Sequence, residues 1–331
     1  MTTTSLPALL QRFFTDRLRS QLGASPHTIA SYRDTFRLLL VFASERLRRD
    51  PSQLNIEELD AALLGTFLEH IEQRRANTPK TRNTRLAAMR AFFRFVAYAE
   101  PACSLQCQRV LAIPAKRHER RPVEFLTDDE TAALLAAPDP ATWIGRRDRA
   151  LLTVAARTGL RNAEIRSLRR RDVELGVGAH VRCSGKGRKT RCTPLRRDVV
   201  AVLEPWLAER PTSPDAPVFP SSRGTFMSAD ALQRLVARHV RVAGATCASL
   251  AGRSITPHTL RHTTAMTLLR RGVDQSVIAL WLGHESTETT QIYLHADMQL
   301  KERALGQADS SGTTPVRFQP SDSLLAFLEG L

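Results

Sequence analysis

The sequence is poor in the features that mark membrane, secreted or disulfide-stabilised proteins. Its 331 residues contain no uninterrupted apolar run of about 18 residues, the length that a membrane-spanning helix requires. The N-terminal stretch lacks the basic segment, apolar core and small-residue cleavage site of a signal peptide. The five cysteines are an odd number, which is typical of reduced thiols in the cytoplasm. We therefore expect a cytoplasmic protein with no membrane partner.

Metal-ligand patterns and aromatic residues are also scarce. Cys103 and Cys107 are four residues apart, but no second close cysteine pair completes a zinc site. His258 and His262 have the spacing of a helical metal pair, yet no HExxH pattern accompanies them, and Arg261 between them would repel a cation. Aromatic residues make up only 6% of the chain, so we expect aliphatic side chains and alanine to fill its core. No metal and no cofactor are predicted.

Acidic residues are few relative to basic ones. Lys plus Arg number 48 against 33 Asp plus Glu, a formal net charge of +15. The excess extends over both halves of the chain, unlike a basic tail attached to a neutral domain. This distribution favours two lobes that each turn a basic face toward a polyanion such as nucleic acid. A general compositional bias toward arginine, which greatly outnumbers lysine here, is the alternative.

Helical periodicity dominates the first part of the chain. Apolar residues recur at helical spacing over 8–20, from Ser25-Pro26 to the break at Pro51, over 56–73 and over 80–99. These segments predict a small all-helical domain at 1–114. The stretch 115–126 is basic, contains proline and lacks apolar periodicity, so we interpret it as an interdomain linker.

The second part is mainly helical with one β interruption. Thr127 and Glu130 form a capping box that begins a helix, and further helices are predicted at 146–158, 161–169, 196–208, 228–242, 256–271, 274–281 and 286–306. Residues 179–194 alternate around a basic Gly-Lys-Gly tip and predict a β-hairpin. The fold class is therefore mainly α with a small β-hairpin sheet. This second domain covers 127–308, and 309–331 is a flexible tail with an apolar terminal helix at 322–331.

Four separated segments of the second domain carry polar side chains suited to one reaction. They contain Arg161, the hairpin lysine Lys186, the pair His258 and Arg261, and His284 with Tyr293 nine residues later. Guanidinium groups match phosphate oxygens and stabilise the charge that builds in a pentavalent transition state. A lysine can protonate a leaving alkoxide, and a tyrosine can attack phosphorus and hold a strand covalently. The set fits phosphodiester chemistry without a metal.

Two choices within this set rest on local context. Tyr32 and Tyr98 lie on apolar stripes of first-domain helices, where we expect packing, so Tyr293 is the candidate nucleophile among the three tyrosines. Lys186 is favoured over Lys189 as the acid because its flanking glycines allow close approach to a backbone. Cys183 and Cys192 flank the hairpin and could face each other as reduced thiols.

Together these segments resemble those of the tyrosine recombinases, the phage-integrase family that includes the Xer-type resolvases. TGLRNAEI resembles the family's first arginine box and GKGRKTRCTPL its lysine β-hairpin. HTLRH resembles the second box, and LGHESTETTQIYLHA resembles the stretch that ends in the nucleophile. They occur in the family's order over about 155–300. The first domain also resembles the family's helical core-binding (SAM-like) domain, especially from Thr78 to Val96.

The resemblance implies a role for each motif residue. Arg161 and Arg261 would bind the scissile phosphate. Lys186 would be the general acid to the leaving 5′-oxygen, and Tyr293 would form a 3′-phosphotyrosine link. His258 would assist proton transfer or phosphate binding.

Further residues would support this chemistry. His284 would orient the phosphate or the nucleophile, and Glu164 matches an acidic position that holds the site together. The candidate contacts to DNA are Lys80, Arg82, Arg85, Arg90, Arg188 and Lys189. His262 is expected to pack or hydrogen-bond within the domain.

The resemblance also implies an assembly. The two domains would clamp double-stranded DNA, and a homo- or hetero-tetramer would act on paired sites in the nucleoid. The terminal helix at 322–331 is expected to dock on a neighbouring protomer, with folding back onto its own domain as the alternative. Whether an accessory directionality protein takes part is left open.

The implied function is site-specific recombination that integrates or excises a mobile element. Xer-type resolution of chromosome or plasmid dimers is the alternative. Three other classes fit less well: a type IB topoisomerase-like enzyme, a DNA-binding regulator with a decayed site, and a metalloenzyme. The complete set of six polar residues argues against a regulator, because binding alone does not require them.

Overall fold

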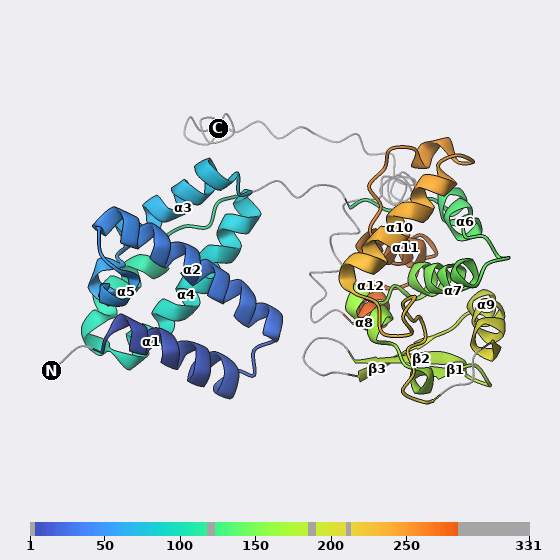
Figure 1. Cartoon of the computed structure of the whole chain (residues 1–331), viewed down its shortest axis with the longest axis horizontal. Coiled ribbons are helices and arrows are strands. Elements are labelled where there is room, and N and C mark those ends of the chain that lie inside the picture. Colours follow the sequence, from blue (N-terminus) through green and yellow to red (C-terminus); the bar gives the residue numbers. More distant parts are fainter. Residues whose placement is uncertain (1–3, 118–122, 185–189, 210–212, 284–331) are drawn as a thin grey trace, which may run out of the picture. The chain divides into compact units, whose positions relative to one another are not determined.

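Two compact units make up the chain, 1–120 and 121–331 (Figure 1). The structure is a computed structural model of the whole chain, and it describes residues 4–117, 123–184, 190–209 and 213–283. Each unit has a hydrophobic core of its own. In the described part of the chain, every helix is too short or too polar to span a membrane.

The first unit is all helical, as the periodicity predicts. Its α-helices are α1 (Leu6–Arg12), α2 (Pro26–Leu47), α3 (Ala61–Arg75), α4 (Pro79–Ala99) and α5 (Ser104–Leu111). Side chains fix where three of them begin: Ser25, Asp60 and Thr78 each accept a hydrogen bond from a backbone N–H of the first turn. Pro26 and Pro79 follow two of these caps, where proline fits the first turn.

The few aromatic residues of the chain are concentrated in the core of this unit. Phe92 lies edge-on to Phe13 and to Phe36, with ring centroids 5.4 and 5.1 Å apart. Such pairs add stabilisation beyond the area that they bury. Most of the buried side chains in this core are aliphatic, as expected, and the phenylalanines add aromatic pairs to them.

Several local predictions for the first unit need correction. The helix predicted at 8–20 is α1 followed by a π-helical segment, Phe13–Gln21. The helix predicted at 56–73 begins at Ala61 instead, because Asp60 caps it and Ile56–Glu58 forms a separate 3₁₀ turn. Helix α5 was not predicted. Tyr98 is 90% exposed, so the expected packing role for it is wrong.

The second unit combines helices with one small sheet. Its helices are α6 (Asp128–Ala136), α7 (Trp143–Thr158), α8 (Asn162–Ser167), α9 (Arg197–Ala208), α10 (Ala229–Ala243), α11 (Pro257–Arg270) and α12 (Gln275–Leu282). The sheet contains β1 (Val173–Glu174), β2 (His180–Ser184) and β3 (Thr190–Pro194), antiparallel in that order. The β2–β3 hairpin and the capping box at Thr127 are as predicted. In the view of Figure 1, the sheet lies below α7, α8 and α12.

Register in the hairpin decides which side chains face the core. Val181 pairs with Thr193 and Cys183 with Arg191. Because side chains alternate along a strand, these four residues share the inner face, and Cys192 lies on the other. Cys183 is buried and Cys192 is exposed. The two cysteines therefore do not face each other, which corrects the sequence-based expectation.

Both ends of the expected linker are bound within the unit next to them. The side-chain amide of Asn83 donates to the carbonyl of Lys116 at 2.8 Å and accepts from its N–H at 3.0 Å. At the other end, the N–H of Leu126 donates to Oγ1 of Thr263 at 2.9 Å. Arg253 donates to the carbonyl of Phe125 at 3.0 Å. Lys116, Phe125 and Leu126 thus each contact the unit next to them.

Candidate active site

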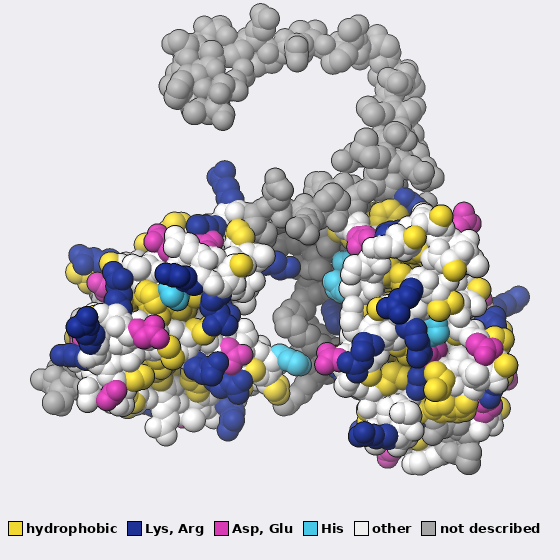
Figure 2. All heavy atoms as spheres, turned by 45° about the horizontal axis from the view of Figure 1, so that its top comes forward, with side chains coloured by type: hydrophobic (Ala, Val, Ile, Leu, Met, Phe, Trp, Pro, Cys, Tyr) yellow, Lys and Arg dark blue, Asp and Glu magenta, His cyan; other side chains and the backbone are white. Residues whose placement is uncertain are grey.

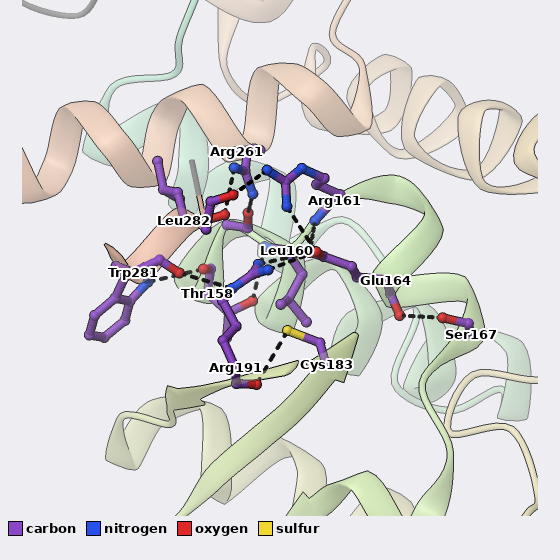
Figure 3. A network of polar contacts seen from close by, with 12 residues as sticks. Thr158, Leu160, Arg161, Glu164, Ser167, Cys183, Arg191, Arg261, Trp281 and Leu282 are labelled. Carbon is purple, nitrogen blue, oxygen red and sulfur yellow. Dashed lines mark hydrogen bonds and ion pairs between the residues drawn. The ribbon is translucent and has the colours of Figure 1, made fainter. Parts of the chain in front are cut away.

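Three arginines converge on the last residues of α12 (Figure 3). Arg191 Nε donates to the carbonyl of Trp281 at 3.2 Å. Arg261 Nη2 donates to the carbonyl of Leu282 at 2.7 Å, and Arg161 Nη2 to that of Gly283 at 2.5 Å. The final carbonyls of a helix lack intrahelical partners and lie at the negative end of its dipole. Three guanidinium groups therefore satisfy three consecutive carbonyls.

Arg161 is placed by the turn between α7 and α8. Gly159 ends α7 in the left-handed conformation, with φ 65°, and Arg161 is the residue before α8. Its N–H donates to Glu164 Oε2 at 2.7 Å, while its Nη1 lies 3.1 Å from Glu164 Oε1. The carboxylate thus holds both the backbone and the side chain of Arg161. The side chain of Arg161 remains 31% exposed.

Arg261 lies in α11, on the side that packs toward α7 and α12. It is 2% exposed. Besides its bond to Leu282, its Nη1 donates to the carbonyl of Gly159 at 2.6 Å. Arg261 therefore joins the turn before Arg161 to the end of α12. This contact brings together two of the segments that the sequence analysis singled out.

His258 lies one turn before Arg261 on α11. It is exposed, and its ring centroid lies 4.3 Å from that of His262 at an interplanar angle of 68°. His262 is thus a packing partner of His258, in keeping with the role expected for it. His258 is the more exposed member of this pair.

Arg191 is the residue of this cluster that the sequence analysis missed. Its Nη1 and Nη2 donate to Glu164 Oε1 and Oε2 at 2.7 and 2.8 Å, a bidentate pair (Figure 3). The alternation of the hairpin could have identified it. Arg191 lies two residues before the buried Thr193, and side chains two residues apart on a strand share a face. A basic residue on that face requires a buried acidic partner.

Glu164 is the common partner of two arginines. Its side chain is 3% exposed. Burial raises its pKa, but hydrogen bonds from Arg191 and from the backbone of Arg161, with the two positive charges, outweigh burial. The net result is a pKa below the ordinary value, so Glu164 is ionised at neutral pH.

Two glycines allow the segments to approach each other. Gly283 has φ 66°, and a Cβ on it would lie 2.7 Å from Nη1 of Arg191. Gly159 has φ 65°, and a Cβ on it would lie 2.6 Å from Cδ2 of Leu282. Both positions therefore require glycine for conformation and for space. Trp281 adds a further tie, because its indole N–H donates to the carbonyl of Thr158 at 3.0 Å.

Part of the expected site lies outside the described residues. This applies to the candidates Lys186, Arg188, Lys189, His284 and Tyr293, and also to the helices expected at 286–306 and 322–331. The structure thus describes Arg161, Glu164, His258 and Arg261 of the expected set. No group of three or more metal-ligating side chains occurs within the ranges that the structure describes.

The basic residues at the start of α4 differ in their surroundings. Lys80 is exposed. Arg82 is 7% exposed, lies 3.7 Å from Glu72 and donates to the carbonyl of Pro114 at 3.1 Å. Arg90 donates to the carbonyl of Ile113. Burial, followed by the charge of Arg75, lowers the pKa of Arg85, which is half-buried.

The four DNA-contact candidates of the first unit thus differ in exposure. Arg82 is turned inward, so it does not form part of the surface, and Arg90 is bound to the chain that leaves α5. Lys80 is the exposed member of the four. Lys and Arg side chains are spread over the visible face of both units (Figure 2).

Both units of the chain match known protein families. Residues 124–300 match the Phage integrase family, and residues 10–100 match the N-terminal SAM-like domain of phage integrases. The chain is 53% identical over 327 residues to the integrase/recombinase y4rC of Sinorhizobium fredii, covering 99% of this chain and 98% of that protein. It is 32% identical to the tyrosine recombinase XerC of Pelobacter propionicus, covering 92% and 96%.

Solved structures share the fold. One is the XerH recombinase bound to its palindromic difH substrate, with a TM-score of 0.69 and 23% identity over 87% of this chain and 82% of that one. Another is the Tn1549 transposon integrase in complex with transposon right-end DNA, with a TM-score of 0.69 and 14% identity over 93% and 100%. The chain belongs to the phage integrase family of tyrosine recombinases, the enzymes that cleave and rejoin DNA.

Proposed function

We propose that this recombinase cleaves duplex DNA through a 3′-phosphotyrosine at Tyr293. One observation carries most weight: Arg161 and Arg261 both donate to the end of α12, the element directly before His284 in the sequence. Two guanidinium groups at one point suit a phosphate, whose oxygens they match in geometry and charge. Tyr293 follows in the chain, and the two other tyrosines belong to the first unit.

In the proposed reaction, each proton transfer has a candidate residue and each bond that forms is matched by one that breaks. The phenolic oxygen of Tyr293 attacks phosphorus, and its proton passes to a base, for which the exposed His258 is the candidate. The bond from phosphorus to the 5′-oxygen breaks, and Lys186 protonates that oxygen as it leaves. Arg161 and Arg261 stabilise the negative charge of the pentavalent transition state. Attack by a 5′-hydroxyl of a partner duplex reverses these steps, so no cofactor is consumed.

Double-stranded DNA is the proposed partner, and a tetramer on paired sites is the proposed assembly. The net charge of +15 and the DNA complexes of the XerH and Tn1549 enzymes support the first point. A lambda integrase tetramer bound to a Holliday junction shares the fold and supports the second. Binding that neutralises about 6–10 phosphates weakens steeply as salt rises.

For the biological role, we propose integration or excision of a mobile element. The similarity to a protein named integrase/recombinase over almost the whole chain supports this role. The similarity to XerC proteins supports resolution of replicon dimers as the second candidate. Recombination between sites that flank the gene would support the first role. Recombination only at a chromosomal dimer-resolution site would support the second.

The terminal helix expected at 322–331 is proposed to dock on a neighbouring protomer and to help place its Tyr293. Deletion of 318–331 is then expected to abolish synapsis and recombination while single-site DNA binding persists. Unchanged recombination after the deletion would refute docking on a neighbour.

The chemistry is tested with a nicked suicide duplex in EDTA. The wild-type protein is expected to form a covalent protein–DNA adduct, because no metal takes part, whereas Tyr293→Phe is expected to form none. A reaction that stops in EDTA, or an adduct of equal yield with Tyr293→Phe, would overturn the proposal.

A further inference from the structure

One buried carboxylate is shared by two arginines (Figure 3). Glu164 accepts from Nη1 and Nη2 of Arg191 at 2.7 and 2.8 Å, one bond to each oxygen. From the side chain of Arg161 it accepts a single bond, to Oε1 at 3.1 Å, besides the bond from the Arg161 backbone N–H. A parallel pair of bonds from a guanidinium to a carboxylate is stronger than one longer bond. Arg191 is therefore the main ion-pair partner of Glu164.

The pKa of Glu164 supports the same ranking. Burial raises this pKa, and the hydrogen bonds from the side chain of Arg191 are the largest of the influences that lower it. The charge of Arg191 also lowers it more than the charge of Arg161 does. Burial lowers the pKa of Arg191 in turn, but its bonds to Glu164 outweigh burial and raise this pKa overall. Both members of the pair are therefore charged at neutral pH.

The charges of the three side chains do not cancel. Two guanidinium groups and one carboxylate leave one positive charge, and because Arg191 and Glu164 form the tighter pair, this charge belongs to Arg161. The side chain of Arg161 is partly exposed, whereas that of Glu164 is buried. The remaining positive charge is thus on a side chain that a phosphate can reach.

Loss of Arg191 would change the partner of the carboxylate. A buried carboxylate that loses two hydrogen bonds is strongly destabilised unless another donor replaces them. Arg161 is the other cation that the structure shows in contact with Glu164, since its Nη1 lies 3.1 Å from Oε1. A rotation of the Arg161 side chain would turn this single bond into a parallel pair. Arg161 would then be neutralised by Glu164 and drawn away from a phosphate.

We propose that Arg191 is a positioning residue that keeps Arg161 available to the scissile phosphate by neutralising Glu164. The proposal rests on the function proposed above, in which Arg161 binds that phosphate. It concerns the attack of the phenolic oxygen on phosphorus, because the charge that then builds on the phosphate oxygens requires a guanidinium with donors to spare. Arg191 itself forms no bond to the substrate and transfers no proton.

The test measures adduct formation by the full-length protein in single turnover on the nicked suicide duplex. Arg191→Gln is expected to slow this reaction about 10- to 100-fold, because Glu164 captures Arg161. The double variant Glu164→Gln/Arg191→Gln is expected to react at least about fivefold faster than Arg191→Gln, because a neutral amide does not capture a guanidinium. This double variant also lacks the bond from Arg191 to the carbonyl of Trp281, so its recovery separates the effect of charge from that of the contact with α12.

A second comparison uses Arg161→Gln, which removes the group on which Arg191 is proposed to act. Arg161→Gln alone is expected to slow adduct formation about 100- to 1,000-fold. Adding Arg191→Gln to it is expected to slow the reaction by no more than about threefold further, because the two residues act as a unit. Independent effects of the two changes would multiply instead. A suicide duplex prevents rejoining, so the adduct of a slow variant can be followed over hours.

Arg253→Gln is the matched control for a loss of stability. Arg253 also donates to a buried carboxylate, Glu130 Oε1 at 2.7 Å, and to the backbone carbonyl of Phe125 at 3.0 Å. Its substitution is expected to lower the melting temperature, as that of Arg191 is. The rate of adduct formation is expected to stay within a few-fold of wild type.

The comparison of Glu164→Gln with Glu164→Gln/Arg191→Gln serves if Arg191→Gln does not fold. Because Arg191 is proposed to act through the carboxylate, its substitution is expected to have little effect once the carboxylate is absent. The two variants are therefore expected to form adduct at similar rates, and a much slower double variant would overturn the proposal.

The other outcomes also decide the proposal. A double variant Glu164→Gln/Arg191→Gln that reacts no faster than Arg191→Gln would overturn it, as would effects of Arg191→Gln and Arg161→Gln that multiply. Arg191 would then act on the phosphate or on α12 directly. A wild-type rate for Arg191→Gln would overturn it too, and a slow Arg253→Gln would assign the effect to lost stability. If the wild-type protein forms no adduct, the proposed function fails instead, whatever Arg191 does.

Discussion

The guanidinium of Arg261 lies between two backbone carbonyls, with Nη1 2.6 Å from the oxygen of Gly159 and Nη2 2.7 Å from that of Leu282. One residue of α11 thus joins the turn that precedes Arg161 to the helix end that precedes His284. Three segments meet through this side chain: Gly159 is 102 residues before Arg261 in the sequence, and Leu282 is 21 residues after it.

Replacing Arg261 with lysine is expected to lower the rate of adduct formation at least about 100-fold. A single ammonium cannot reach both carbonyls and also bind a phosphate as a fork does. DNA binding, measured by gel shift, is expected to change only a few-fold because many other contacts supply affinity. Adduct formation at the wild-type rate would show that Arg261 is structural.

Gly283→Ala is expected to displace the end of α12. The alanine would adopt a positive φ, at a cost of about 1–2 kcal/mol, and its Cβ would collide with Arg191. We expect a lower melting temperature together with slower adduct formation. Gly272→Ala is the matched control, because Gly272 has φ 78° but nothing within 4 Å of its Cβ position. Equal adduct rates for the two variants would contradict this account.

Stability at acid pH is expected to depend on Glu164. Its pKa is lower in the folded state, so its contribution is fully present above the ordinary value of 4.5 and is lost as the pH falls through the lower folded value. Glu164→Gln is therefore expected to reduce the free energy of unfolding by about 3 kcal/mol at pH 7, since it breaks a buried pair. The difference from wild type is expected to shrink as the pH falls below 4.5, as measured by denaturant titration followed by circular dichroism. A difference that stays constant over that range would contradict it.

Lys80 and Arg82 are expected to differ in effect although they are two residues apart. Lys80→Ala is expected to reduce the slope of log binding constant against log salt concentration by about one, because Lys80 is exposed. Arg82→Ala is expected to lower the melting temperature of the protein, because the buried Arg82 pairs with Glu72. A smaller salt slope for Arg82→Ala together with a lower melting temperature only for Lys80→Ala would place Arg82 at the DNA.

The thiols are expected to react at very different rates. Cys192 is exposed, whereas burial raises the pKa of Cys183 to about 11. Alkylation of the native protein is therefore expected to label Cys192 much faster than Cys183. Cys192→Ser should remove the fast phase. Formation of a Cys183–Cys192 disulfide under mild oxidation would contradict the placement of these two residues on opposite faces of the hairpin.

Much of the fold followed from local patterns in the sequence. Caps such as Thr78 and Thr127 and the terminal Gly159 and Gly283 have local physical effects, and they predicted where helices begin and end. The hairpin also followed from alternation around its glycines. Helix α5 and strand β1 were missed because each is short and its packing depends on contacts far away in the sequence.

The site was only partly predictable for the same reason. Arg161, His258 and Arg261 stand in recognisable motifs, but the inward direction of Arg82 depends on Glu72 of a different helix. Tyr98 is 90% exposed although Val96 is fully buried, because residues two apart on a helix point to nearly opposite faces. The inward position of Arg191 depends on the strand register, which pairs it with Cys183, and its contact with Glu164 joins two elements far apart in the sequence.

The central claim is that the phosphate held by Arg161 and Arg261 becomes bound to Tyr293. It is tested most directly by trapping the adduct on a suicide duplex, digesting the protein and identifying by mass spectrometry the peptide that carries the nucleotide. The account predicts a modified peptide that contains Tyr293 and unmodified peptides for Tyr32 and for the exposed Tyr98. A nucleotide on any other residue, or on more than one tyrosine, would contradict it.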